Sequence, residues 1–160
     1  MNKKYLYSFA ITFLLSVTNL LQAQDGLFKE ILQSLKKEYP QAVWDQKLLV
    51  VSVWEINDLN SRDMNKTLNK TTNTYRVAKL KGGLKGMVWV CVAASGENAE
   101  VNITLQKDGV TSCISFPLRQ ISGFDLPIGA NRVYNSAGEL IYQNVPTNNF
   151  FESIHSLITR

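Results

Sequence analysis

The chain has 160 residues, 45% of them hydrophobic, and its 17 Lys and Arg outweigh 13 Asp and Glu to give a formal net charge of +4. This length and apolar fraction are typical of one domain with a well-filled core. The charge excess is too small to indicate a nucleic-acid-binding protein. Beyond the N-terminal segment, no run is long and apolar enough to predict a membrane span.

The N-terminal segment has the pattern of a cleaved signal peptide. Lys3 and Lys4 precede an apolar run over residues 9–17, and residues 21–23 (Leu-Gln-Ala) offer a cleavage site. The run is shorter than the roughly 20 residues that span a bilayer, and no cysteine follows it, as one would in a bacterial lipoprotein. Removing residues 1–23 takes away two Lys and lowers the formal charge from +4 to +2. The segment resembles those of Gram-negative bacteria, which predicts a periplasmic or secreted protein.

The first element expected in the exported chain is a helix over residues 25–39. Leu27, Ile31 and Leu35 recur at a spacing of four residues, which is the period of one helix face. Asp25 is a suitable N-cap for this helix, and a proline follows the segment.

Two continuous apolar runs predict strands that are buried on both faces. They cover residues 47–54 and 87–94, and a loop rich in Lys and Gly over residues 81–86 precedes the second. Such runs are typical of the central strands of a largely parallel sheet.

A polar helix is expected between these two strands, over residues 60–73. Met64 and Leu68 form a thin apolar stripe along it, and either Asp58 or Asn60 could cap its N-terminus.

Residues 97–107 are ambiguous from periodicity alone. Four apolar residues alternate with polar ones, as in a strand, but Val101 and Leu105 also fit one face of a helix.

The C-terminal part predicts a short strand, a hairpin and a helix. The strand covers residues 111–116, and the hairpin joins residues 132–134 to 139–142 through a turn that contains Gly. Pro146 opens the last helix. Alternating strands and helices followed by a hairpin predict an α/β sandwich with a mixed central sheet.

One stretch of the chain resembles the active-site region of the thioredoxin-like fold family, in its extracytoplasmic thiol–disulfide oxidoreductase branch. In that family a strand ending in Phe-Trp leads to Cys-x-x-Cys and a basic residue. Here Val53-Trp54 and Arg62 match the flanks, and Asn57 stands where a second Trp is common. The Cys-x-x-Cys positions are occupied by Asp58, Leu59, Asn60 and Ser61.

The resemblance extends from residue 44 to the C-terminus. Residues 134–141 are similar to the family's Ile-Asp-x-x-Gly-x-Ile hairpin, and the cis-proline that precedes it is replaced by Gly129 or Ala130, with Pro127 close but shifted. The resemblance therefore predicts a helical extension over residues 24–43 and a thioredoxin-like domain over residues 44–160. The resemblance also implies that residues 97–107 form a helix.

Two functional marks of the family are thus missing together, which predicts that its redox chemistry is absent. Disulfide exchange requires a thiolate and a resolving cysteine. Asp58 can cap the helix but cannot form a disulfide, and Ser61 is a weak nucleophile without a nearby base. The single histidine, His155, lies in the last predicted helix, where it suggests no catalytic arrangement. We therefore expect no catalytic residue and no cofactor. No metal site is expected either, because the carboxylates Glu97, Glu100 and Asp108 are scattered along the chain.

The two cysteines, Cys91 and Cys113, leave two interpretations open. Export and an even count favour a disulfide. Cys91 lies inside the apolar run over residues 87–94, however, where a free cysteine behaves as a small hydrophobic residue.

The function predicted from these patterns is that of an exported, non-catalytic protein that binds a protein or peptide partner. The expected contact surface is the former active-site region: Trp54, Asn57, the four residues from Asp58 to Ser61, Gly129 and Ala130. Trp54, like Trp89, is more readily explained as a core residue. The alternative function is a thiol–disulfide oxidoreductase that uses Cys91 and Cys113 instead of the lost pair.

Overall fold

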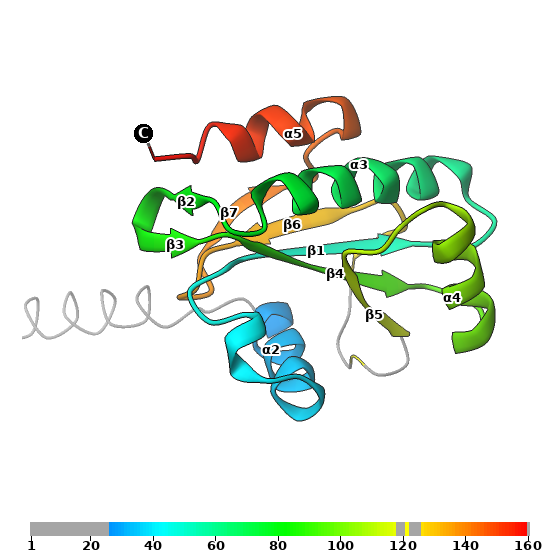
Figure 1. The fold of residues 1–160 in the computed structure, drawn as a ribbon. Coiled ribbons are helices and arrows are strands. Elements are labelled where there is room, and N and C mark those ends of the chain that lie inside the picture. Colours follow the sequence, from blue (N-terminus) through cyan, green and yellow to red (C-terminus); the bar gives the residue numbers. More distant parts are fainter. Residues whose placement is uncertain (1–25, 118–120, 122–125, 160) are drawn as a thin grey trace, which may run out of the picture.

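The computed structural model describes residues 26–117, 121 and 126–159. These residues form a mixed five-stranded sheet in the order β5-β4-β1-β6-β7, with helices on both faces (Figure 1). The strands are β1 (Leu48–Trp54), β4 (Met87–Ala93), β5 (Cys113–Pro117), β6 (Asn131–Tyr134) and β7 (Leu140–Gln143). β1, β4 and β5 run parallel, whereas β6 and β7 are antiparallel to their neighbours. The predicted α/β sandwich with a mixed sheet is confirmed.

β1 lies at the centre of the sheet because its side chains are apolar on both faces. Leu48 to Trp54 are all buried, as are all seven residues of β4. The two strands pair in parallel over their full length, from Leu48 opposite Met87 to Trp54 opposite Ala93. Both strands predicted from continuous apolar runs are confirmed.

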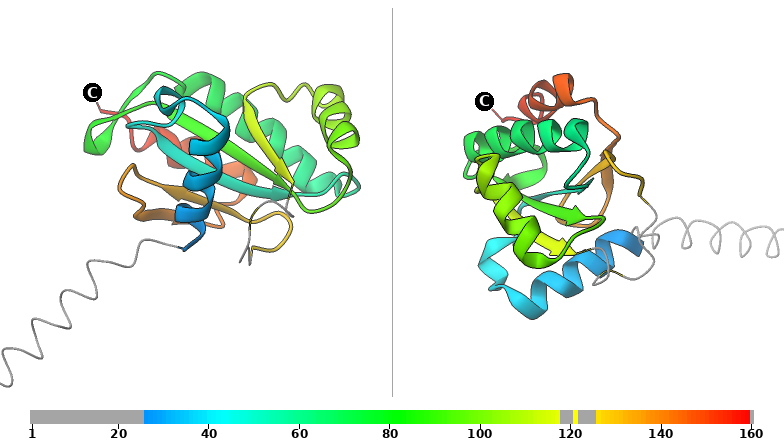
Figure 2. Two further views of the ribbon diagram at one scale, coloured as in Figure 1. Left: turned by 90° about the horizontal axis from the view of Figure 1, so that it is seen from below. Right: turned by 90° about the vertical axis from the view of Figure 1, so that its right-hand side faces the viewer.

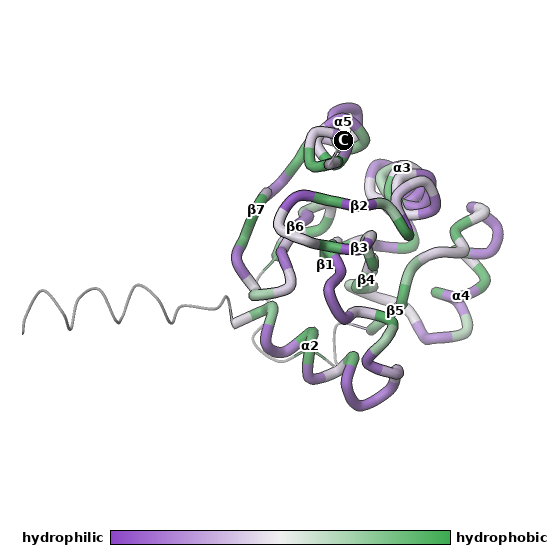
Figure 3. Tube along the Cα trace, turned by 60° about the vertical axis from the view of Figure 1, so that its left-hand side comes forward, coloured by the Kyte–Doolittle hydropathy of each residue, from purple (hydrophilic) through white to green (hydrophobic). Residues whose placement is uncertain are grey.

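Helix α2 (Gly26–Glu38) covers one face of the sheet, opposite α3 (Leu59–Tyr75) and α5 (Thr147–His155) (Figure 2). Along α2 the hydropathy alternates between hydrophobic and hydrophilic stretches (Figure 3). Its buried side chains are Leu27, Phe28, Ile31 and Leu35. They share a core with the alternate residues of β1 and β4 that point to this face: Leu49, Val51, Val88, Val90 and Val92. The N-terminal helix is therefore packed against the sheet rather than separate from it.

The hairpin between β6 and β7 provides a second anchor for α2. Asn135 closes the turn, because its side-chain Oδ1 accepts hydrogen bonds from the backbone N–H groups of Ala137 and Glu139, at 2.9 and 3.0 Å. Gly138 has φ +84°, and a Cβ there would lie 2.6 Å from Cδ1 of Phe28. The glycine predicted in this turn thus also makes room for the ring of Phe28.

Helices α3 (Leu59–Tyr75) and α5 (Thr147–His155) cover the other face. Met64 and Leu68 of α3 and Ile154 of α5 are buried there against β1 and β4. Both predicted helices are confirmed, and α3 extends two residues beyond the expected end.

The ambiguous segment is a helix, α4 (Asn98–Lys107). A capping box decides this: Glu97 caps the N-terminus, and the Glu100 carboxylate accepts from the Glu97 backbone N–H at 3.2 Å. Val101 and Leu105 are buried on its inner face, as the helical period requires.

The predicted loop over residues 81–86 is more ordered than the sequence suggests. It holds a short 3-10 turn (Lys81–Gly83) between β2 (Lys79–Leu80) and β3 (Leu84–Lys85), which pair as a separate two-stranded sheet. A second 3-10 turn, Gln41–Val43, links α2 to β1. The predicted signal peptide and its neighbour Asp25 lie outside the described residues. Within the part of the chain that is described, no helix has the length and apolar character of a membrane span.

Candidate functional site

The candidate site lies where β1 ends and α3 begins. The backbone leaves the sheet at Trp54, makes a tight turn and enters the helix at Leu59. The Asp58 N–H donates to the Glu55 carbonyl at 3.2 Å, which closes this turn. This is the carboxyl end of a parallel strand, the place where open α/β sheets bind ligands.

Asp58 is the N-cap of α3. Its carboxylate Oδ2 accepts a hydrogen bond from the Ser61 backbone N–H at 3.0 Å. Hydrogen bonds from Ser61, first through its side chain and then through its backbone, lower the pKa of Asp58. Asp58, which the resemblance aligns with the first cysteine, therefore carries a fixed negative charge at neutral pH and interacts favourably with the helix dipole.

Ser61 is buried and already fully engaged. Its hydroxyl donates to the Asp58 carbonyl at 3.0 Å and accepts from the Glu55 backbone N–H at 3.1 Å. His155 bonds instead to the hydroxyl of Tyr75, at 2.9 Å, at the far end of α3. The helical rise places Tyr75 about 21 Å along the axis from Ser61. Ser61 and His155 therefore cannot form a nucleophile–base pair.

A loop before β6 lies against the same end of β1. The Gly129 N–H donates to the Val53 carbonyl at 2.9 Å, and the Val53 N–H donates to the Ala130 carbonyl at 3.0 Å. These two bonds bring Gly129 and Ala130, which the resemblance places where the family has its cis-proline, next to the end of β1. Gly129 is exposed, whereas Ala130 is buried.

Trp54 lies beneath this surface and not on it. Its side chain is fully buried, as is that of Trp89, whose Nε1 donates to Ser52 Oγ at 2.8 Å. The interpretation of both tryptophans as core residues is confirmed. A partner would therefore meet the residues above Trp54 and not its indole ring.

Two large apolar side chains are exposed at this strand end. Leu59, in the first turn of α3, is 70% exposed, and Ile128, next to Gly129, is 46% exposed. We use the name "rim" for the exposed or half-buried residues that surround the strand end: Asn57, Asp58, Leu59, Asn60, Ile128 and Gly129. Sequence reasoning missed Ile128. Its position between a proline and a glycine, outside any apolar stripe, is the signal that could have found it.

Acidic side chains border the rim on the side of β4 and α4. The Glu55 carboxylate accepts from Ser95 Oγ at 3.2 Å, which ties the turn after β1 to the loop after β4. That loop opens a cavity of about 360 Å³, and its lining includes Glu97 and Glu100. With Asp58, these carboxylates make the carboxyl end of the parallel strands acidic.

Arg62, the residue that matches the family's basic position, is engaged structurally. Its guanidinium forms an ion pair with Asp108, at the end of α4, at 2.7 Å. Asp108 therefore holds the first turn of α3, the helix that begins at the site, against the end of α4.

Among the described residues, no group of three His, Cys, Asp or Glu side chains could hold a metal ion.

Cys91 and Cys113 are free thiols on neighbouring strands. Cys113 pairs with Trp89 and not with Cys91, so the two cysteines are diagonal neighbours in the sheet. With standard strand spacing and rise, their Cα atoms are about 8 Å apart, beyond the roughly 7 Å that a disulfide spans. Burial raises the pKa of Cys91, with a further contribution from the Cys113 thiol. Joining the two would require the strands to move.

No protein-family model matches the sequence, and no curated protein matches it either. Solved structures do match the fold. The thioredoxin domain of a thiol-disulfide oxidoreductase from Bacteroides vulgatus has a TM-score of 0.56 at 13% identity, covering 72% of this chain and 81% of that chain. A thiol-disulfide oxidoreductase from Bacteroides fragilis has a TM-score of 0.56 at 10% identity, covering 71% and 83%.

A secreted disulfide oxidoreductase from Mycobacterium tuberculosis gives a similar result. Its TM-score is 0.54 at 12% identity, and the match covers 74% of this chain and 88% of that chain. At such low identity these likenesses report the arrangement of the backbone and not the chemistry. The mixed sheet, the helix that begins directly after its central strand and these solved structures together show that the chain has a thioredoxin-like fold.

Proposed function

We propose that this protein is an exported, non-catalytic thioredoxin-like protein that binds a segment of another protein through its rim. One observation carries the proposal: the two positions where the fold's redox chemistry would need thiols hold an N-cap carboxylate and a buried, fully hydrogen-bonded hydroxyl. The surface around them is nevertheless exposed and apolar at Leu59 and Ile128.

The rim also indicates what kind of segment would bind. Leu59 and Ile128 offer apolar contacts on either side of the strand end, and buried apolar anchors supply most of the affinity at protein interfaces. Asp58 within the rim, and Glu55, Glu97 and Glu100 beside it on the side of β4 and α4, add negative charge. Complementary charge gives specificity and speeds association. We therefore expect a partner segment in which apolar residues are flanked by Lys or Arg.

Export is part of the same proposal. It rests on the basic and apolar start of the chain, and the secreted oxidoreductase among the structural neighbours is consistent with it. Cell fractionation followed by N-terminal sequencing would test it. The expected result is extracytoplasmic protein that begins at Gln24. Cytoplasmic protein that retains Met1 would contradict it.

A peptide-binding measurement tests the role of the rim. The probes are two short fluorescent peptides that alternate Leu with Lys or Leu with Glu, and fluorescence anisotropy reports the affinity. We expect the Lys peptide to bind more tightly than the Glu peptide. The double change Leu59→Lys with Ile128→Lys should weaken its binding at least about tenfold, because both apolar anchors are lost and the two new positive charges repel the Lys side chains of the peptide.

Leu140→Lys is the matched control, since Leu140 is 43% exposed on β7 and outside the rim. It should leave the affinity for the Lys peptide unchanged. Equal loss of affinity in the control and the double variant would show that binding is not located at the rim. Equal affinity of the wild-type protein for both peptides would contradict the role of the acidic border.

A further inference from the structure

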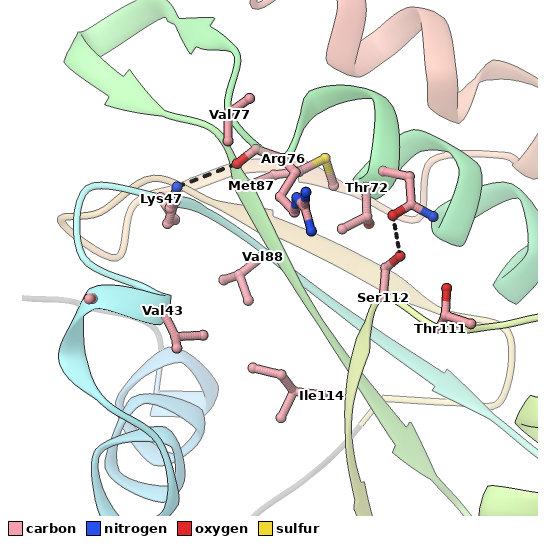
Figure 4. Close-up of a pocket in the computed structure, with 12 residues that line it drawn as sticks. Val43, Lys47, Thr72, Arg76, Val77, Met87, Val88, Thr111, Ser112 and Ile114 are labelled. Atoms are coloured by element: carbon pink, nitrogen blue, oxygen red, sulfur yellow. Dashed lines mark hydrogen bonds between the residues drawn. The ribbon is translucent and has the colours of Figure 1, made fainter.

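A second and larger cavity lies at the opposite end of the parallel strands. Its volume is about 570 Å³, which is within the range of sites for small molecules. It opens between the C-terminal turn of α3 and the starts of β4 and β5 (Figure 4). The rim lies at the carboxyl ends of these strands, so the two sites are separated by the length of the sheet.

One part of this cavity is apolar. Val88 from the start of β4, Ile114 from β5 and Val43 from the turn after α2 line it together, and their side chains converge in Figure 4. Val88 is buried, and Val43 and Ile114 are half-buried. These three aliphatic side chains form a surface that can hold the apolar part of a ligand.

The other part is positively charged. The Arg76 guanidinium extends into the cavity between Met87 and the hydroxyl groups of Thr72 on α3 and Ser112 just before β5 (Figure 4). Lys47 lies beside it, and its Nζ donates to the backbone carbonyls of Lys85, at 2.5 Å, and Arg76, at 3.4 Å. None of the described residues that line the cavity is acidic.

The backbone that carries Arg76 is held in a defined position. Gly86 has φ +98°, and a Cβ at this residue would overlap the Arg76 carbonyl, so the chain packs here at backbone contact. The Lys47 bond to the same carbonyl adds a second restraint. Among the described residues, by contrast, the Arg76 guanidinium has no carboxylate within ion-pair distance. Its donors are therefore available to an anion.

A buried polar atom without a partner lies beside the same cavity. Thr72 is 3% exposed and lines the cavity, and its Oγ1 makes no hydrogen bond. Nearby, Asn73 Oδ1 accepts from Ser112 Oγ at 2.7 Å, which leaves the amide N–H donors of Asn73 unused in that contact. Buried polar groups normally have partners; the Thr72 oxygen lacks one, although it is closed off from the cavity itself.

We propose that this cavity binds a small amphipathic anion. Its carboxylate or phosphate would accept two parallel hydrogen bonds from Arg76, and its apolar body would lie on Val43, Val88 and Ile114. Arg is suited to this task, because its planar donors match both oxyanions in a two-point geometry. The proposal does not depend on the function proposed for the rim, since the two sites share no residue.

Calorimetric titration of the protein, expressed from the full sequence and purified as the cell processes it, tests this proposal. The probes are sodium decanoate, decyl phosphate, decan-1-ol and sodium acetate. We expect at least one of the two long-chain anions to bind and to be preferred over both decan-1-ol and acetate. Whichever of decanoate and decyl phosphate binds more tightly identifies the preferred head group as a carboxylate or a phosphate.

Variants locate the binding. Arg76→Gln should weaken the affinity for the preferred anion at least about tenfold, because hydrogen bonds to charged groups contribute at this level. Arg76→Lys keeps the charge but loses the two-point geometry, so its affinity should be intermediate. Lys70→Gln removes one positive charge from an exposed position of the same helix outside the cavity and should change the affinity less than twofold.

Four results would overturn the proposal, and the first three concern the probes and Arg76. They are an unchanged affinity in Arg76→Gln, equal binding of decan-1-ol and the long-chain anions, and no binding of either anion. A loss as large in Lys70→Gln as in Arg76→Gln would mean that only the overall charge attracts the probe, and would also overturn it. Peptide binding at the rim should be the same in Arg76→Gln as in the wild-type protein, so failure at one site is distinguishable from failure at the other.

Discussion

Arg62 and Asp108 form a two-point ion pair, in which Nε lies 2.8 Å from one carboxylate oxygen and Nη2 lies 2.7 Å from the other. Their side chains are 25% and 9% exposed. The pair joins the first turn of α3 to the residue that follows α4, so it fixes the helix that begins at the rim. The hydrogen bonds from Arg62 lower the pKa of Asp108.

This pair predicts a pH-dependent part of the stability. Because the folded-state pKa of Asp108 lies below its unfolded value of about 3.9, the pair stabilises the protein above that pH. Its contribution is lost as the pH falls through the folded-state pKa. We expect Asp108→Asn to lower the free energy of unfolding at neutral pH by about 1–3 kcal/mol. In urea unfolding, the difference from the wild-type protein should shrink below about pH 4.

Asp63→Asn is the control for this measurement, since Asp63 pairs with Lys66 at 2.8 Å on an exposed helix face. It should change the stability much less than Asp108→Asn, because solvent screens exposed pairs. A difference between Asp108→Asn and wild-type protein that stays constant down to pH 3 would show that the variant acts through packing and not through the charge.

The thiol of Cys91 should be unreactive in the folded protein. Cys91 is fully buried, and burial raises its pKa, so little of the reactive thiolate forms near neutral pH. We expect an alkylating reagent to leave Cys91 unmodified in the native state, whereas two thiols should react after unfolding. An insulin-reduction assay on the same protein should show no turnover. Turnover that disappears in Cys91→Ser or Cys113→Ser would establish the alternative redox function instead.

Placing two thiols at the positions that the resemblance aligns with Cys-x-x-Cys should give the chain redox activity. The Asp58→Cys and Ser61→Cys changes place both thiols at the N-terminus of α3, where the helix dipole stabilises a thiolate. We expect the double variant to form an internal disulfide and to reduce insulin, which the wild-type chain should not do. Asp58→Ser with Ser61→Cys is the control with one thiol. A double variant that is folded but never forms the disulfide would contradict the assignment of these positions.

Gly86 should be less replaceable than Gly82, although both have positive φ angles, of +98° and +74°. A Cβ at Gly86 would overlap the Arg76 carbonyl, whereas a Cβ at Gly82 would meet no atom within 4 Å. Gly82→Ala should therefore cost only the strain of its backbone conformation, about 1 kcal/mol. Gly86→Ala should cost more than that and also disturb the cavity. Thermal unfolding of the two variants measures the difference, and equal melting temperatures would show that the backbone contact at Gly86 relaxes freely.

The sequence by itself determined those helices, strands and turns whose hydrophobic or capping pattern fits only one kind of element. The continuous apolar runs of β1 and β4 can be satisfied only where both faces are covered, so they had to be central strands. Asp58 or Asn60 as a cap, followed by a helical stripe at Met64 and Leu68, predicted α3 to within two residues at each end. The turn from Asn135 to Gly138 predicted its hairpin, because the Asn side chain and the permissive Gly act over a few residues.

Only the tertiary structure decided what lies together across the fold. Residues 97–107 have a pattern that satisfies either period, and the capping contact between Glu97 and Glu100 settled the choice. The Arg62–Asp108 pair spans 46 positions in the chain. Ile128 lies near the end of β1 because β6 pairs with β1. The cavity that Arg76 enters likewise depends on which elements are neighbours. Crossovers and sheet order set these long-range contacts, and no local period encodes them.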